Sequence, residues 1–365
     1  MDVISLFSGC GGLDLGFEQA GFKIAFANDI DKSLDETYEL NHKLKLDNRS
    51  IEDLKGKGLP ESDGIIGGPP CQSWSLAGKM LGAKDRRGML FFEYVRVIEE
   101  KQPKFFVAEN VPGIVSSAHI AEFKKLLSLF EEAGYIVSYK VLDARDYGVP
   151  QERKRVIIVG YRKDLRMKFQ FPQPTYSKQG GKAIDGRQMQ KYITLKEALG
   201  DLPEAVPAVE KNRHVEEGLL FPNQEYMTGS FSTIYMSRNR LKKWNDCSYT
   251  IQAGGRHAPL HPSSSQMCKV SADKWIFAGE SPKYRRLSVR EAARIQTFPD
   301  NFIFIYKRLA DGYKMVGNAV PVKLAYAVAK KIAEDFALAA GSSSKITKKR
   351  SRKTVINNAL LYSKP

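Results

Sequence analysis

Cysteine and long apolar runs are both scarce in this chain of 365 residues. The four cysteines, Cys10, Cys71, Cys247 and Cys268, stand far apart and form no CxxC pair. This spacing argues against a zinc site or any other metal centre and against a disulfide scaffold, and it fits a reducing compartment. No run of about 18 apolar residues occurs, so no transmembrane span is expected. The first residues read as a strand and not as a basic-then-apolar export signal, so we expect a cytoplasmic protein.

Acidic residues are outnumbered by basic ones. Lysine and arginine number 57 against 41 aspartates and glutamates, which leaves a formal net charge of +16. Seven of the basic residues lie in 341–365, where no acidic residue stands, but the rest of the chain is also basic. This balance suggests a polyanionic partner, nucleic acid first. A soluble protein with a basic surface is the alternative.

The first 160 residues alternate between β-rich runs and helical periods, which predicts an α/β fold with a parallel sheet and helices on both faces. Expected strands are Val3–Phe7, Lys23–Asn28, Gly64–Ile66, Lys104–Ala108, Ile136–Leu142 and Arg155–Tyr161. Expected helices are Leu13–Ala20, Ser33–Asn41, Leu90–Lys101, Ala121–Ala133, Ser288–Gln296 and Val322–Leu338.

The domain organisation follows from a change of composition after Tyr161, where Pro, Gly, Ser, Asn and basic residues replace regular periods. We expect residues 1–164 to form the first part of a catalytic and cofactor-binding domain and 165–304 to form a smaller, irregular domain. Residues 305–340 would return to the first domain, and the basic tail 341–365 would be disordered.

A glycine-rich loop follows the first expected strand, in Phe7-Ser8-Gly9-Cys10-Gly11-Gly12. Glycines there allow backbone N–H groups at a helix N-terminus to approach a ligand closely. Asp29, at the end of the second expected strand, can accept hydrogen bonds from ribose hydroxyls. The spacing is not GxGxxG and no phosphate-binding lysine follows, so a nucleoside without phosphates, such as S-adenosylmethionine, fits better than a dinucleotide.

A second unusual frame surrounds Cys71, in the stretch GGPPCQSWS at 67–75. Two prolines fix φ at successive positions, and the glycines before them permit close approach of the backbone to another group. The frame indicates a sulfur held at one point to act as a nucleophile; a buried structural thiol is the alternative.

Six ordered motifs carry a family resemblance along nearly the whole chain. They are Phe7-Ser8-Gly9-Cys10-Gly11-Gly12, Gly68-Pro69-Pro70-Cys71-Gln72, Glu109-Asn110-Val111, Gln151-Glu152-Arg153-Lys154-Arg155, Arg286-Leu287-Ser288-Val289-Arg290-Glu291 and Gly317-Asn318-Ala319-Val320-Pro321. With these motifs the chain resembles the DNA (cytosine-5)-methyltransferases of bacterial restriction-modification systems. The stretch 232–240, STIYMSRNR, further resembles the enzymes that modify GGCC.

The resemblance implies a Rossmann-like, S-adenosylmethionine-dependent sheet domain, a target-recognition domain and a DNA cleft between them. It implies methyl transfer to C5 of a cytosine flipped out of double-stranded DNA, which would protect host DNA from a cognate restriction endonuclease. We expect a monomer in the bacterial cytoplasm, associated with DNA.

Four residues are implied to be catalytic. The Cys71 thiolate would add to cytosine C6, which makes C5 nucleophilic. Glu109 would act near N3, where a desolvated carboxyl keeps its proton more readily. Arg155 would bind the O2 side of the base, and Arg153 would hold the cysteine loop or the DNA backbone. A strand-end salt bridge for Glu109 and a solvated charge run at 152–155 are the alternatives.

Binding residues also follow from the resemblance. Implied cofactor contacts are Phe7, Gly9, Gly11, Asp29, Pro70, Leu90, Asn318 and Val320. The family's acidic residue that meets the adenine amino group has no match here, since its slot falls near Ser50, with Asp47 three residues earlier. Implied DNA contacts are Ile234, which would wedge into the stack, and Arg238, Arg240 and Arg256, which would read guanines or bind phosphates.

Two other functions are compatible with parts of this pattern. A tRNA cytosine methylase of related fold would have a shorter variable region than the roughly 120 residues between Tyr161 and Arg286. A catalytically dead DNA-binding regulator would not need Cys71, Glu109 and Arg155 together.

Overall fold

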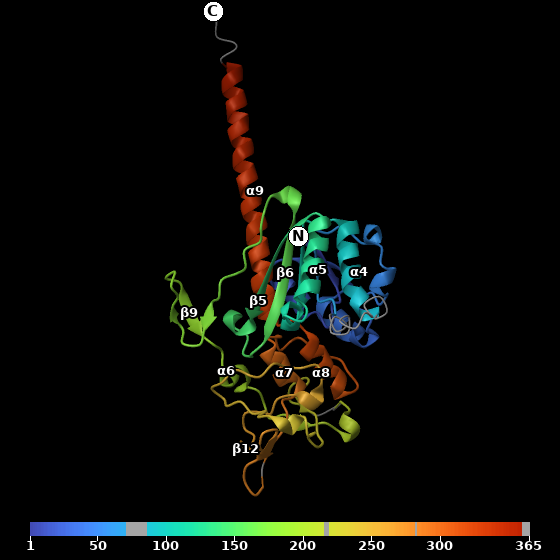
Figure 1. The fold of residues 1–365 in the computed structure, drawn as a ribbon, viewed down its shortest axis with the longest axis vertical. Coiled ribbons are helices and arrows are strands. Elements are labelled where there is room, and N and C mark those ends of the chain that lie inside the picture. The colour runs from blue at the N-terminus through green and yellow to red at the C-terminus, as the bar shows by residue number, and fades with distance from the viewer. Residues whose placement is uncertain (71–85, 215–218, 282, 360–365) are drawn as a thin grey trace, which may run out of the picture.

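A computed structural model describes residues 1–70, 86–214, 219–281 and 283–359 of the chain. Its centre is a six-stranded sheet in the order β2-β1-β3-β4-β6-β5 (Figure 1). The strands are β1 (Asp2–Leu6), β2 (Lys23–Asn28), β3 (Gly64–Gly67), β4 (Phe105–Asn110), β5 (Tyr135–Asp143) and β6 (Lys154–Arg162). The α/β fold expected from the sequence is confirmed.

One strand departs from the parallel sheet that the alternation predicted. The neighbouring pairs β2–β1, β1–β3 and β3–β4 are parallel, whereas β6 is antiparallel to both of its neighbours, β4 and β5. The short connection from β5 to β6 explains the difference, because parallel neighbours require a crossover of a dozen residues or more. Only residues 144–153 separate these two strands.

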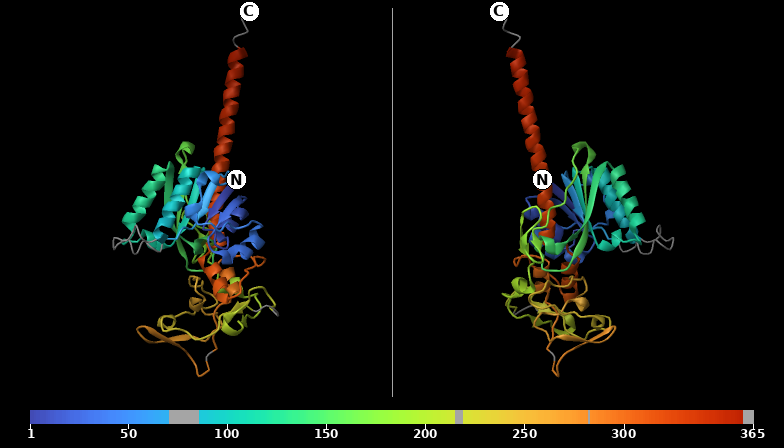
Figure 2. Two further views of the ribbon diagram at one scale, coloured as in Figure 1. Left: turned by 90° about the vertical axis from the view of Figure 1, so that its right-hand side faces the viewer. Right: turned by 60° about the vertical axis from the view of Figure 1, so that its left-hand side comes forward.

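Helices cover both faces of the sheet (Figure 2). α4 (Arg86–Lys101) and α5 (Ile120–Glu132) pack on one face, in the core that contains Ile4, Phe106 and Phe130. α1 (Gly12–Gln19) packs against α9 on the other face, in the core that contains Val3 and Phe17. Neighbouring strand residues such as Val3 and Ile4 thus enter opposite cores, as the alternation of side chains along a strand requires. α2 (Asp35–His42) follows β2.

Residues 165–304, here called the recognition region, lie mostly beyond one end of the sheet (Figure 1). Phe169, near their start, still packs on Tyr161 of β6. Their strands are short: β7 (Tyr176–Ser177), β8 (Gly181–Lys182), β9 (Gln188–Lys191), β10 (Val206–Pro207), β11 (Glu225–Tyr226), β12 (Met267–Ser271) and β13 (Lys274–Phe277). Their helices are α6 (Leu195–Leu199) and α7 (Val289–Ile295), each opened by a capping box. These elements are short and are joined by long stretches without regular structure.

The chain then returns to the sheet through α8 (Leu309–Asn318) and α9 (Val322–Ala359). The buried residues Val322, Leu324 and Val328 of α9 join the core against α1. α9 continues as helix to Ala359, which corrects the expectation that residues 341–365 are disordered. No proline interrupts α9, and its first part, 322–340, is rich in alanine, a good helix former. The helix then passes through Gly341 and the serines at 342–344, which are weaker helix formers. Residues 360–365 lie outside the described residues.

No helix of the part that the structure describes is both long and apolar enough to span a membrane.

Candidate active site

A cavity of about 780 Å³ opens at the carboxyl ends of β1, β3 and β4. The sheet order reverses between β1 and β3, because β1 leads outward to β2 and β3 leads outward to β4. In open α/β sheets a ligand binds in the crevice outside the carboxyl ends at such a switch point. The loops after β1 and β3 both line this cavity, together with residues 314, 315 and 317–320 from the end of α8 and the loop after it.

The glycine loop and Asp29 form one end of this cavity. The Gly9 N–H donates to Asp29 Oδ2 at 2.9 Å, and the Asp31 N–H donates to Oδ1 at 3.0 Å. Burial raises the pKa of Asp29 by desolvation, against the lowering effect of these two hydrogen bonds. Gly9 has φ +59, and a Cβ built on it would meet no atom within 4 Å, so this backbone is open to a ligand. These features fit a hydroxyl-bearing nucleoside.

Seven of the eight implied cofactor residues line this cavity. They are Phe7, Gly9, Asp29, Pro70, Leu90, Asn318 and Val320. Gly11 is not among the residues that line the cavity, and its contact with the cofactor stays a prediction. Gly11 has φ +87, and a Cβ there would lie 1.9 Å from His42 Nε2, so this glycine makes room for the His42 ring.

Neither candidate for the adenine contact lies in the cavity lining. The Asp47 carboxylate forms a bidentate pair with Arg49, with Nη2 at 2.7 Å. The Ser50 hydroxyl accepts a hydrogen bond from the Glu52 N–H at a short helical turn. Asp47 pairs with Asn28 at the carboxyl end of β2, but both side chains are engaged by local partners and do not line the cavity.

Glu109 and Arg155 form the other end of the same cavity. Arg155 Nε lies 2.7 Å from Glu109 Oε1, and each side chain is only 12% exposed. Glu109 stands on β4, where Val156 of the antiparallel strand β6 pairs with the next residue, Asn110, so strand pairing brings the two charges together. The ion pair considered as an alternative for Glu109 is thus present, and it lies inside the cavity.

Cys71 lies outside the described residues, but the residues that lead to it are described. Pro70 lines the cavity, and Asn110 Nδ2 donates to the Pro69 carbonyl oxygen at 2.9 Å. Asn110 therefore ties the end of β4 to the chain just before Cys71. The sequence contained a signal for this role, since a polar amide ends a buried strand inside a quoted motif, but no role was inferred for it. Lys314 and His119 also line the cavity, and no sequence pattern pointed to them.

Arg153 is buried and bound to the main chain. Its side chain is 1% exposed and donates to the carbonyl oxygens of Ile251 (2.8 Å), Gly317 (3.1 Å) and Ala319 (2.9 Å). Desolvation lowers the pKa of Arg153 to about 9, which leaves the guanidinium charged at neutral pH. This burial contradicts an exposed contact with the DNA backbone, one of the two roles expected for Arg153. The other role, on the cysteine loop, involves residues outside the described part.

The described cysteines are poor nucleophile candidates. Cys10 is buried, and its thiol donates to the Met315 carbonyl oxygen at 3.4 Å. Burial raises the pKa of Cys10 to about 12, so the thiol stays protonated at neutral pH. Cys247 is half-buried, and burial raises its pKa as well; Cys268 is exposed on β12.

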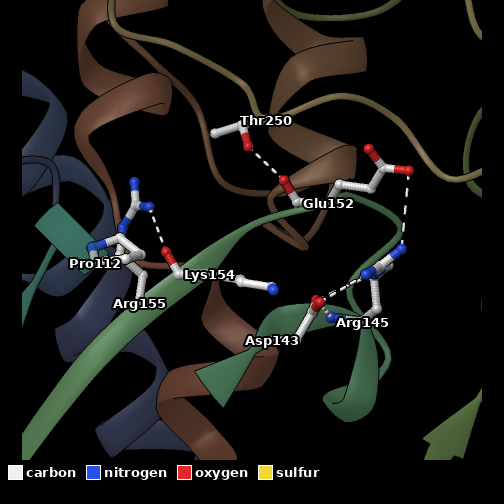
Figure 3. A pocket seen from close by; sticks show the side chains of 7 residues that line it. All are labelled: Pro112, Asp143, Arg145, Glu152, Lys154, Arg155 and Thr250. Atoms are coloured by element: carbon white, nitrogen blue, oxygen red, sulfur yellow. Dashed lines mark hydrogen bonds and ion pairs between the residues drawn. The ribbon is translucent and has the colours of Figure 1, made fainter. Parts of the chain in front are cut away.

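A second cavity, of about 480 Å³, adjoins the first through Arg155, which lines both (Figure 3). Arg145 and Lys154 add positive charge to it, and Thr250 of the recognition region closes one side. Arg145 pairs with Asp143 at 2.7 Å, and the Thr250 hydroxyl donates to the Glu152 carbonyl oxygen. This cavity thus lies where the two regions meet, which is where a DNA cleft was expected.

The four implied DNA contacts differ in exposure. Ile234 is 66% exposed, and Arg238 and Arg256 are exposed as well. Arg240 is buried: its Nε donates to the Tyr235 carbonyl oxygen at 3.0 Å, and Nη2 donates to that of Ile234 at 3.3 Å. Its guanidinium also lies over the Tyr235 ring, 4.8 Å from the centroid. Arg240 therefore supports the turn that presents Ile234, a role that the sequence did not indicate.

Comparison with known proteins identifies the family. The family model of the C-5 cytosine-specific DNA methylases matches residues 1–334. The chain belongs to this family. The methylase is thus a DNA (cytosine-5-)-methyltransferase, as the ordered motifs implied.

Two curated relatives span nearly the whole methylase. The Type II methyltransferase M.MthTI of Methanothermobacter thermautotrophicus is 60% identical over 337 residues, which cover 92% of this chain and 98% of the relative. The Type II methyltransferase M.FnuDI of Fusobacterium nucleatum is 50% identical over 360 residues, 98% of this chain and all of the relative (100%). A solved DNA modification methyltransferase of an Escherichia coli prophage superposes with a TM-score of 0.66 at 26% identity, covering 92% of this chain and 99% of that one.

Proposed function

We propose that the methylase transfers the methyl group of S-adenosylmethionine to C5 of a cytosine within GGCC in double-stranded DNA. In the cell this reaction would protect host DNA from a partner restriction endonuclease. The observation that carries the proposal is one cavity lined both by Asp29 and by the Glu109–Arg155 pair. The names of the two relatives support the restriction-modification setting, and the stretch 232–240 supports the site GGCC.

Asp29 and the glycine loop are the proposed cofactor end. The Asp29 carboxylate would accept the ribose hydroxyls, and the open backbone at Gly9 allows the nucleoside to approach. S-adenosylmethionine would supply an electrophilic methyl group there. The return of the chain at Asn318 and Val320 closes the cavity on its other side.

The reaction on the base is assigned to Cys71, Glu109 and Arg155. The target cytosine must leave the duplex stack to reach a cavity at this depth. The Cys71 thiolate would form a bond to C6, and the ring electrons displaced by this addition make C5 nucleophilic. A protonated Glu109 would donate to N3 and Arg155 would donate to O2, where the displaced charge gathers. When C5 has accepted the methyl group, loss of the C5 proton expels the thiolate and restores the ring.

The paired state of Glu109 and Arg155 suits this role. A charge that is largely buried is costly without a partner, and each group compensates the other while no base is bound. Entry of the base would then break this pair: Glu109 takes up a proton from solvent and donates it in a hydrogen bond to N3, and Arg155 donates to O2. Both groups are therefore held in position before the substrate arrives.

A trapping experiment tests the assignment of the nucleophile. A GGCC duplex with 5-fluorocytosine at the target position has no C5 proton to lose, so the adduct should persist on denaturing gels. We expect the wild type to be trapped only with S-adenosylmethionine, and Cys71→Ser to form no adduct and to lose at least about 10³-fold in turnover.

Cys247→Ser is the matched control and should be trapped like the wild type, because the Cys247 thiol donates to the Ile193 carbonyl oxygen and does not line the cavity. A trapped Cys71→Ser protein would refute the assignment. Trapping of the wild type on a tRNA substrate and not on DNA would instead indicate the tRNA methylase, and no adduct at all would indicate a regulator. Bisulfite sequencing of plasmid DNA from expressing cells would identify the methylated cytosine and the site.

A further inference from the structure

Residues Gln151 and Arg153, from the motif at the start of β6, form hydrogen bonds to both main-chain groups of Ile251 in the recognition region. The Ile251 N–H donates to Gln151 Oε1 at 3.1 Å, and the Ile251 carbonyl oxygen accepts from Arg153 Nη1 at 2.8 Å. The adjoining main chains also pair, because the Glu152 N–H donates to the Ser248 carbonyl oxygen and the Ser248 N–H to that of Pro150. Residues 248–251 are thus fixed to the strand that carries Arg155.

The same two side chains reach the loop that lines the cofactor cavity. Arg153 Nη2 donates to the carbonyl oxygens of Gly317 and Ala319. Gln151 Nε2 donates to Gln296 Oε1 at 2.5 Å, and Gln296 Nε2 donates in turn to the carbonyl oxygens of Val316 (2.7 Å) and Ala319 (3.0 Å). We call Gln151, Arg153 and Gln296 the amide–arginine network. Gln151 and Gln296 have no exposed surface and Arg153 almost none.

The network ends on the two segments that the reaction must coordinate. Ile251 stands five residues before Arg256, an implied base-reading residue, and Gly317 and Ala319 line the cavity with Asn318 between them. The two segments also touch directly. A Cβ on Gly317 would lie 2.2 Å from the Gln252 carbonyl carbon, and one on Gly255 would lie 2.5 Å from the ring of Tyr313 on α8.

This arrangement transmits displacement. The interior is close-packed, and the hydrogen bonds of the network end on main-chain atoms. A shift of Ile251 would therefore strain or displace the main chain at Gly317 and Ala319. Arg153 has no salt bridge within the described part of the chain, and its charge is held by three carbonyl oxygens from two segments. A lysine could not replace this fork, because an ammonium is a point charge without the planar, spread donors of a guanidinium.

We propose that the amide–arginine network couples base reading to the cofactor cavity, with Arg153 and Gln151 as positioning residues. When cognate DNA orders residues 251–256, the affinity of residues 316–320 for the cofactor rises. Bound cofactor raises the affinity for cognate DNA by the same factor, as linkage requires. The inference rests on the proposed function for the identity of the cofactor.

Titration calorimetry with S-adenosylhomocysteine tests the coupling without turnover. The quantity measured is the ratio of its affinity in the presence of a GGCC duplex to its affinity for the enzyme alone, with a duplex altered at one base of the site as reference. For the wild type we expect a ratio of about tenfold with GGCC, within the usual range of coupling between sites, and close to one with the altered duplex. In Arg153→Lys and Gln151→Met the GGCC ratio should fall below about threefold.

Arg290→Lys is the matched control. Arg290 is also fully buried and donates to three main-chain carbonyl oxygens, those of Pro222, Pro299 and Phe302, but it does not contact the network. Its variant should lose stability and keep the wild-type ratio. If Arg153→Lys fails to fold, Gln151→Met carries the test, because Gln151 is uncharged and does not line the cavity.

Network variants that keep the wild-type ratio would overturn the proposal, and so would a wild-type ratio of one on a duplex that the enzyme methylates. If bisulfite mapping shows methylation at a site other than GGCC, the proposed specificity fails. The same titration with the mapped site then still decides the coupling.

Discussion

Phe106 on β4 and Arg286 in the recognition region are both buried, yet they stabilise their surroundings in different ways. Phe106 has no exposed surface and stacks on Phe130 of α5 at 4.2 Å between ring centroids. Arg286 donates to the carbonyl oxygens of Gly229 and Ser230 and lies over the Phe231 ring at 4.1 Å. The sheet region is stabilised by apolar surface buried between the sheet and its helices. The recognition region is stabilised by buried charged side chains that donate hydrogen bonds to the carbonyl groups of its loops.

The difference follows from how each region pairs its backbone. In the sheet, ladders satisfy the N–H and C=O groups, so side chains are free to be apolar. In the recognition region the strands have two to five residues, and many buried carbonyl groups need another donor. Arg240, Arg286 and Arg290 supply it. The comparison shows how an irregular surface can be held in one shape without a continuous sheet.

The strongest test of this comparison replaces one buried aromatic residue of the sheet region and one buried arginine of the recognition region. Phe106→Ala should lower the free energy of unfolding by about 3–5 kcal/mol, through lost apolar contact and a cavity between β4 and α5. Arg286→Met keeps the volume and leaves carbonyl groups unpaired, so a loss of about 2 kcal/mol is expected.

Urea unfolding followed by far-UV circular dichroism and by tryptophan fluorescence would measure both, in a Trp74→Phe background, since the other two tryptophans, Trp244 and Trp275, lie in the recognition region. We expect Phe106→Ala to shift the dichroism transition most and Arg286→Met the fluorescence transition. An Arg286→Met protein as stable as the wild type would contradict the role given to buried arginines.

A second test separates exposed from buried arginines inside the recognition region. Arg256→Ala should weaken binding to GGCC by about 1–3 kcal/mol and leave binding to other sequences nearly unchanged, if Arg256 reads a guanine. Arg240→Ala should instead lower the stability of the region, because the carbonyl groups of Ile234 and Tyr235 lose their donor. Fluorescence anisotropy with cognate and altered duplexes, beside thermal unfolding, would distinguish them. Equal loss on every duplex would mark Arg256 as a phosphate contact.

The smallest expected effect concerns the sheet region and pH. Burial raises the pKa of Asp29, so protonation begins at a higher pH than for an ordinary aspartate, near 4. The affinity for S-adenosylhomocysteine should then be highest above the raised pKa and fall as the pH drops through it, because the protonated Asp29 carboxyl is a weaker hydrogen-bond acceptor. We expect a loss of up to about tenfold on acidification and a flatter profile for Asp29→Asn. A wild-type profile as flat as that of Asp29→Asn would contradict this role.

The sequence predicted the sheet region well. Apolar runs gave the six strands within a few residues, and motifs at strand ends located Asp29 and Glu109 at one edge, because parallel strands place their carboxyl ends together. The reversed direction of β6 was missed, since an apolar run has no direction. The expected disorder of the tail was wrong at least to Ala359, because a helix that packing has started can extend through residues whose own composition does not indicate one.

What the amino-acid sequence by itself determined is which chemistry the chain carries: the residue types in its motifs, their order and the strands that present them. Only the tertiary structure decided which charges face the cavity and which serve the packing. Arg153 and Arg155 stand two residues apart, yet Arg155 meets Glu109 and Arg153 is enclosed by Ile251, Gly317 and Ala319. Those partners come from segments about 100 and more residues away, and no local pattern encodes such contacts because packing between distant segments creates them.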